Sequence, residues 1–196
     1  MLDPLLNRRT IVKASGEMIE LPFSGSGPTL GGATLLENGN LVTNRTLMDA
    51  KGAGIPLQEY GASGQLLARF GGDELFSMSE SWKMSRLVSG RPGGGLLVLH
   101  PQSARLEVYD SARQLVEVFV RTAPWLAESA PDREPSGGYS SIRPSTIAQA
   151  VWESNRDSVW VATLIPSPTW RPVAAGGKAA APKDRFHTVV EVIDFT

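Results

Sequence analysis

The hydrophobic positions of this chain fall into short runs that are separated by Gly, Asn, Asp, Ser or Pro. Runs of this length between turn-forming residues are typical of strands in an antiparallel meander, in which tight turns join successive strands. Two successive stretches of the chain follow the same four-strand plan. The predicted strands are 33–37, 40–44, 57–60 and 65–70 in the first complete unit, and 83–89, 96–100, 106–109 and 115–120 in the second.

The turns inside the first unit are also visible in the sequence. Asn38-Gly39 lies between the first two predicted strands. Both residue types tolerate positive φ, so this pair predicts a two-residue hairpin turn. The segment from Tyr60 to Gln65, which contains two glycines, is expected to make the turn between the third and fourth strands.

The chain repeats itself with a period of about 48 to 49 residues, a spacing that indicates stacked supersecondary units. The segment 60–70 matches the segment 109–119 in its Tyr, Gln-Leu and Phe positions. A third copy begins at 157–163 and resumes at 189–194. A single four-stranded sheet cannot bury both of its faces, so the copies must pack face to face.

These repeats resemble the six-bladed β-propeller group that includes the NHL-repeat proteins. The units of that group end in a strand, a turn with glycine and a second strand followed by Phe. The segments that carry the resemblance to this pattern are 60–71, 109–119 and 189–194. The middle copy departs from the pattern because Arg113 stands where the turn glycine is expected. The resemblance implies an all-β fold of four-stranded antiparallel blades arranged as a β-propeller.

About three blades are predicted, which is too few for a closed ring, because natural propellers use about four to eight. We therefore expect an incomplete ring within a single partial propeller domain. The chain would be a piece of a longer propeller, or a second copy would complete the ring, or the sheets would keep open edges. The domain covers 1–196, with units at approximately 10–23, 29–71, 82–120 and 145–196.

Composition narrows the function classes. The 19 Lys and Arg against 20 Asp and Glu give a net charge of −1, so the basic surface of a general nucleic-acid binder is not expected. The chain has no cysteine, which excludes disulfides and thiol nucleophiles. No apolar run is long enough for a membrane span, and the first residues do not read as a secretory leader, so we expect a soluble chain. The compartment stays open, and it would be extracytoplasmic if the chain belongs to a longer secreted bacterial protein.

Histidine offers the only weak catalytic candidates, His100 and His187. Neither has a second histidine at the spacing of a helical zinc motif. A structural or surface role is the simpler interpretation of both residues.

Some six-bladed propellers that this chain resembles are lactonases or lyases with calcium or zinc in the axial channel, which implies that oxygen ligands could converge from several blades. Turn formation by Asp and Asn explains the same residues without a metal. The weak metal-ligand candidates at predicted strand ends are Asn44, Asp49, Glu153, Asn155, Asp157 and Asp194.

The leading hypothesis is a non-enzymatic binding module for a protein, peptide or small-molecule ligand, without a cofactor. The alternative is a lactonase-like hydrolase or lyase with calcium or another divalent cation in the axial channel. Trp152 and Trp160 lie in strand-like runs and are expected to pack between blades. The speculative binding residues, on loops and rims, are Arg45, Arg86, Arg105, Trp125 and Tyr139.

Overall fold

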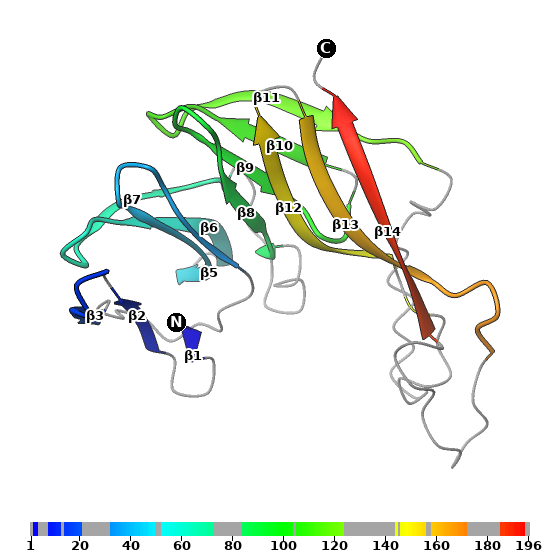
Figure 1. The fold of residues 1–196 in the computed structure, drawn as a ribbon, viewed down its shortest axis with the longest axis horizontal. Helices are drawn as coiled ribbons and strands as arrows, with labels where there is room; N and C mark the ends of the chain where they lie inside the picture. The colour runs from blue at the N-terminus through cyan, green and yellow to red at the C-terminus, as the bar shows by residue number, and fades with distance from the viewer. Residues whose placement is uncertain are drawn as a thin grey trace.

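In the computed structural model, most of the residues whose structure is described lie in antiparallel β-sheets (Figure 1). In every sheet the hydrogen-bonded neighbours are also neighbours in sequence, so each sheet is a meander. The residues that the structure describes are 2–3, 8–12, 14–20, 32–49, 52–72, 84–103, 105–123, 144, 146–155, 158–171 and 185–194.

Four sheets follow one another along the chain, and we number them I to IV. Sheet I contains β1 (Leu2–Asp3), β2 (Arg8–Val12) and β3 (Met18–Glu20). Sheet II contains β4 (Ala33–Leu35), β5 (Leu41–Asp49), β6 (Gly52–Tyr60) and β7 (Leu66–Phe70). Sheet III contains β8 (Leu87–Gly90), β9 (Leu96–Leu99), β10 (Arg105–Tyr109) and β11 (Leu115–Val120). Sheet IV contains β12 (Ile147–Asn155), β13 (Ser158–Pro166) and β14 (Phe186–Asp194).

The sheets are arranged like the blades of a propeller. Sheet III lies between sheets II and IV (Figure 1), and its first strand, β8, contacts the first strands of both neighbours, β4 and β12. The first strands therefore lie innermost and the last strands outermost, and the ring is not closed. The prediction of an all-β fold with four-stranded antiparallel blades in an incomplete ring is confirmed.

The core consists of two layers, one on each face of sheet III. All four residues of β9, Leu96 to Leu99, are buried, because alternate side chains point to opposite faces and both faces are covered. The layer between sheets II and III contains Leu36, Val42, Leu57, Leu96, Val98 and Tyr109. The layer between sheets III and IV contains Leu97, Leu99, Leu106, Val108, Ala148, Val151, Val159 and Val161.

The first hairpin turn differs from its prediction. The Leu36 N–H donates to the Asn40 carbonyl over 2.8 Å, and the Gly39 N–H donates to the Leu36 carbonyl over 2.9 Å. Gly39 has a φ of 81°, whereas Asn38 is not among the residues with positive φ. The loop is thus the three-residue kind, a type I turn followed by one left-handed residue, which requires a single glycine rather than an Asn-Gly pair.

Candidate functional site

A cleft lies where the ends of the three innermost strands meet. Its volume is about 320 Å³. A hydrogen bond of 3.1 Å from the Gly90 N–H to the Thr34 hydroxyl joins two of its walls. The lining residues come from β4 and the β4–β5 turn, from β8 and the β8–β9 turn, and from β12. They are Thr34–Glu37, Ser89–Pro92, Gly94, Gly95, Trp152 and Glu153.

An ion pair between sheets III and IV closes the polar side of this cleft. The Arg91 Nε–H donates to Glu153 Oε2 over 2.6 Å, and its Nη2 donates to Oε1 over 3.0 Å. The Glu153 side chain has no exposed surface. These hydrogen bonds raise the pKa of Arg91 above its ordinary value. Two parallel charge-assisted bonds fix the geometry of the pair, so the cleft has a rigid and internally neutralised wall.

The other walls combine polar Thr34 and Ser89 with two apolar residues that are exposed. Leu35 is 60% exposed and Trp152 is 56% exposed. Glu37, on the rim, is exposed and accepts a hydrogen bond of 3.2 Å from the Gly93 N–H. Because Arg91 and Glu153 neutralise each other, Glu37 leaves the lining with one unbalanced negative charge.

A second polar cluster surrounds Glu107 on β10. Its Oε1 accepts hydrogen bonds from Arg105 Nε at 2.7 Å and from His100 Nε2 at 3.0 Å. Its Oε2 accepts the Tyr109 hydroxyl at 2.9 Å. Burial by itself would raise the pKa of Glu107, but the bonds from His100, Tyr109 and Arg105 outweigh it and lower this pKa to about 2. Burial lowers the pKa of His100, so its ring is neutral at pH 7 and donates its Nε2 proton to the carboxylate.

Two sequence candidates are therefore brought together here, although in a buried network rather than an open site. His100 and Arg105 both bond Glu107, and Arg86, which is buried nearby, also lowers the pKa of His100 through its charge. Glu107 is not among the candidates that the sequence indicates. The repeat could have indicated it, because Glu107 matches Gln58 in the preceding unit. The Tyr60 hydroxyl donates to Gln58 over 2.7 Å, just as the Tyr109 hydroxyl donates to Glu107.

The second histidine candidate lies elsewhere. His187 Nε2 is 3.2 Å from the Ser167 hydroxyl, which also lies 2.9 Å from the Thr169 hydroxyl. Ser167 is buried, and among the described residues no carboxylate is recorded on the other nitrogen of His187. A nucleophilic serine needs an accessible oxygen and a base oriented by a third group, so this pair lacks two features of a catalytic constellation.

The three metal-ligand candidates whose side chains are described, Asn44, Glu153 and Asp194, lie on β5, β12 and β14 and do not form one cluster. Asn44 is buried, and its Nδ2 donates to the carbonyls of Pro56 and Met84, each over 3.0 Å, while its Oδ1 accepts the Arg86 N–H over 3.0 Å. Asn44 is thus a crosslink between sheet II and the segment that leads into sheet III. Asp194 is exposed at the end of β14.

Within the described part of the chain, no three His, Asp or Glu side chains are close enough to share a metal ion. Asp157 lies outside the described residues, and the side chains of Asp49 and Asn155 are not described. Among the speculative binding residues, Trp125 and Tyr139 lie outside the described residues, and the Arg45 side chain is not described.

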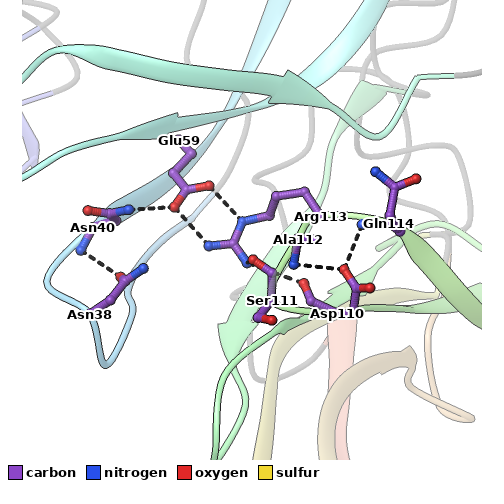
Figure 2. A network of polar contacts seen from close by, with 8 residues as sticks. All are labelled: Asn38, Asn40, Glu59, Asp110, Ser111, Ala112, Arg113 and Gln114. Atoms are coloured by element: carbon purple, nitrogen blue, oxygen red, sulfur yellow. Dashed lines mark hydrogen bonds and ion pairs between the residues drawn. The ribbon is translucent and has the colours of Figure 1, made fainter.

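A third network joins sheets II and III (Figure 2). Arg113 donates from Nε to Glu59 Oε2 over 2.7 Å and from Nη2 to Oε1 over 2.8 Å. Asn40 Nδ2 donates to the same carboxylate over 2.7 Å. Burial would raise the pKa of Glu59, but the bonds from Arg113 and Asn40 lower it. Arg113 has a φ of 65°, and Gly64 has a φ of 87° at the matching place in sheet II, so this departure from the glycine pattern positions an arginine for a bond between blades.

No protein-family model matches the chain, and no curated protein does. Some solved structures are similar to the chain at low identity. It is similar to the virginiamycin B lyase of Staphylococcus aureus, with 10% identity, a TM-score of 0.46, and coverage of 86% of this chain and 49% of the lyase. It is also similar to a protein of unknown function from Bacteroides caccae, with 10% identity, a TM-score of 0.44, and coverage of 85% of this chain and 52% of the other.

The chain thus spans about half the length of these two structures. Similarity at this level carries no argument about activity. No helix in the described part of the chain has the length and apolar character that crossing a membrane requires.

Proposed function

We propose that this protein is a non-enzymatic binding module and that the cleft at the ends of the innermost strands is its binding site. The observation that carries the proposal is the pairing, in one cleft of about 320 Å³, of exposed apolar side chains with a rigid ion pair. This volume lies at the lower end of the range of about 300 to 1,000 Å³ that is usual for ligand sites. Propeller membership in the six-bladed NHL-type group remains part of the proposal, supported by the repeated segments 60–71 and 109–119.

The lining indicates the chemistry of the ligand. Trp152 borders the cleft from the face of β12 opposite to Glu153, so its indole can contact a flat ring or the apolar face of a sugar only at the rim. Arg91 and Glu153 already satisfy one another, so neither needs an oppositely charged ligand group. The remaining charge is that of Glu37, which disfavours an anion. We expect a small neutral or cationic ligand that contains a ring, or a peptide side chain of that kind.

This proposal is favoured over a metal-dependent hydrolase or lyase because of how the candidate ligands are used. The Glu153 carboxylate accepts two bonds from Arg91, and the Asn44 amide is fully engaged with backbone groups. A calcium site needs several oxygen ligands that converge on one point.

Ligand-observed NMR on a panel of methyl glycosides and neutral, cationic and anionic heteroaromatic fragments tests the proposal. Neutral or cationic ring compounds should bind, and Leu35→Ala and Trp152→Ala should each weaken binding by about fivefold or more, since each removes a buried contact of the ligand. Leu67→Ala is the matched control, because Leu67 is a leucine that is 50% exposed on β7 and does not line the cleft. Binding that is equal in all three variants, or a panel without binders, would contradict the proposal.

A further inference from the structure

The outer face of sheet IV is an apolar surface without a covering sheet in the described residues. Trp152, Trp160 and Val192 are paired directly across β12, β13 and β14. The adjacent row on the same face is Ala150, Ala162 and Val190. We call these six residues the sheet IV face. It contradicts the expectation that both tryptophans pack between blades, because Trp152 and Trp160 lie on strands as predicted but are 56% and 42% exposed.

The opposite face of sheet IV packs against sheet III. Val151, Val159 and Val161 alternate with the exposed residues and are buried against sheet III. Sheet II packs on sheet III in the same manner. In both contacts, one face of a sheet packs against the sheet that follows it in the chain. The sheet IV face is the next surface of this series.

The other end of the series also carries exposed apolar residues. Val12 and Met18 are paired across β2 and β3 of sheet I, and both are exposed. Sheet I therefore offers an apolar surface at the start of the series, and the sheet IV face offers one at its end. The six residues of the sheet IV face carry no charge, so a second apolar sheet meets no unpaired charge there.

We infer that the sheet IV face docks on sheet I of a second copy of this chain, and that two copies pair head to tail with two such contacts. Leu35, a proposed ligand contact, is not part of the sheet IV face. Trp152 belongs both to the sheet IV face and to the lining of the cleft. The sheet IV face and sheet I are different surfaces, so the contact is heterologous. The two copies form a closed pair only if the sheet IV face of the second copy also reaches sheet I of the first. The sheets fan around one side of an axis in Figure 1, so a second copy would supply the other side. Two copies with four sheets each would form a ring of eight, which is within the range of natural propellers although the NHL-type group has six.

The exposed area supports two contacts rather than one. Two tryptophans and two valines that are each about half exposed present roughly 400 Å². A stable complex buries about 800 Å² on each partner, so a single contact of this size is too small. In a closed head-to-tail pair each copy buries the sheet IV face at one end and sheet I at the other, where Val12 and Met18 add roughly 200 Å². The two copies together then bury roughly 1,200 Å², which is at the lower limit of the range for stable interfaces.

Light scattering coupled to size exclusion across a dilution series tests the inference. The wild-type chain should elute with twice the 21.0 kDa mass of one chain. Val190→Lys should elute as single chains, because it places a charge in the contact. Val116→Lys is the matched control and should remain paired, since Val190 and Val116 are 57% and 58% exposed and Val116 lies on the outer strand of sheet III. A single-chain wild type, masses that grow beyond the pair, or a paired Val190→Lys would overturn the inference.

A mixing experiment identifies the partner surface. Met18→Lys alters sheet I and should also elute as single chains. A mixture of Met18→Lys and Val190→Lys keeps one intact contact. It joins the unaltered sheet I of the Val190→Lys chain to the unaltered sheet IV face of the Met18→Lys chain. One contact alone is weak, so the mixture should form pairs only at the highest concentrations of the dilution series, where it should form more of them than either variant does alone. If two sheet IV faces docked on each other instead, Met18→Lys would remain paired, and this result would overturn the head-to-tail arrangement. Circular dichroism melts confirm that each variant is folded.

Discussion

Glu107→Gln isolates the contribution of one buried carboxylate to stability. The folded protein lowers the pKa of Glu107 from its ordinary value of 4.5 to about 2. The unfolded chain therefore binds a proton more readily, so the stabilisation is complete above pH 4.5 and is lost as the pH falls toward 2. The difference corresponds to about 3 kcal/mol of unfolding free energy at pH 7.

Urea unfolding at pH 7 and pH 3 measures this contribution. Gln keeps the shape of the side chain and a hydrogen-bonding oxygen for Tyr109, but it lacks the charge that Arg105 requires. We expect Glu107→Gln to lower the unfolding free energy by about 3 kcal/mol at pH 7 and by about 1 kcal/mol at pH 3, where the unfolded wild-type chain is already protonated. Comparison of the variant with the wild type at each pH cancels the other titrating groups that the variant leaves unchanged.

The control is Glu117→Gln, which removes an exposed carboxylate from β11. It should change the unfolding free energy by no more than about 0.5 kcal/mol at either pH. A loss for Glu107→Gln that is the same at pH 7 and pH 3 would refute the reasoning, because the cost would then come from packing and not from the ionised carboxylate.

Three further predictions follow from the contacts between sheets. Arg113→Gly relieves about 1 kcal/mol of backbone strain at a positive φ but removes two charge-assisted bonds to Glu59. We expect the unfolding free energy measured in urea to fall by about 1 to 3 kcal/mol, and a more stable variant would contradict this prediction. Asn44→Ala leaves two buried carbonyls and one N–H without the bonds that the amide makes, so we expect the unfolding free energy to fall by about 2 to 4 kcal/mol in the same measurement. A fall below about 1 kcal/mol would show that water replaces the amide. The melting temperature should not rise on addition of calcium, because Glu153 is committed to Arg91, and a concentration-dependent rise would support the hydrolase or lyase alternative.

The strand pattern was largely readable from the sequence. The predicted strands 96–100, 106–109 and 115–120 differ from β9, β10 and β11 by one residue at most at each end. The prediction failed for β5 and β6, which extend to Asp49 and begin at Gly52. The polar and glycine residues in that stretch do not form a clear apolar run, and a long two-stranded extension satisfies their backbone groups by pairing.

The candidate site was less readable, because its groups come from different repeats. Arg91 and Glu153 are 62 positions apart, and Arg113 and Glu59 are 54 positions apart. Neither separation equals the repeat period, so the repeat does not show that these residues meet. Glu107 was recoverable in principle from its match to Gln58, whereas the pairing of His100 and Arg105 on its carboxylate was not.

The sequence by itself determined the local features of this protein: short strands, tight turns with glycine at the left-handed position, and antiparallel meanders in a repeated series. These depend on neighbouring residues, since backbone torsions and side-chain alternation act over a few positions. The tertiary structure decided which face of each strand meets another sheet. It buried Val151 and left Trp152 exposed beside it, and it joined Arg91 to Glu153 across two sheets. Alternation along a strand separates two faces but does not say which is covered, because that depends on how adjacent sheets stack.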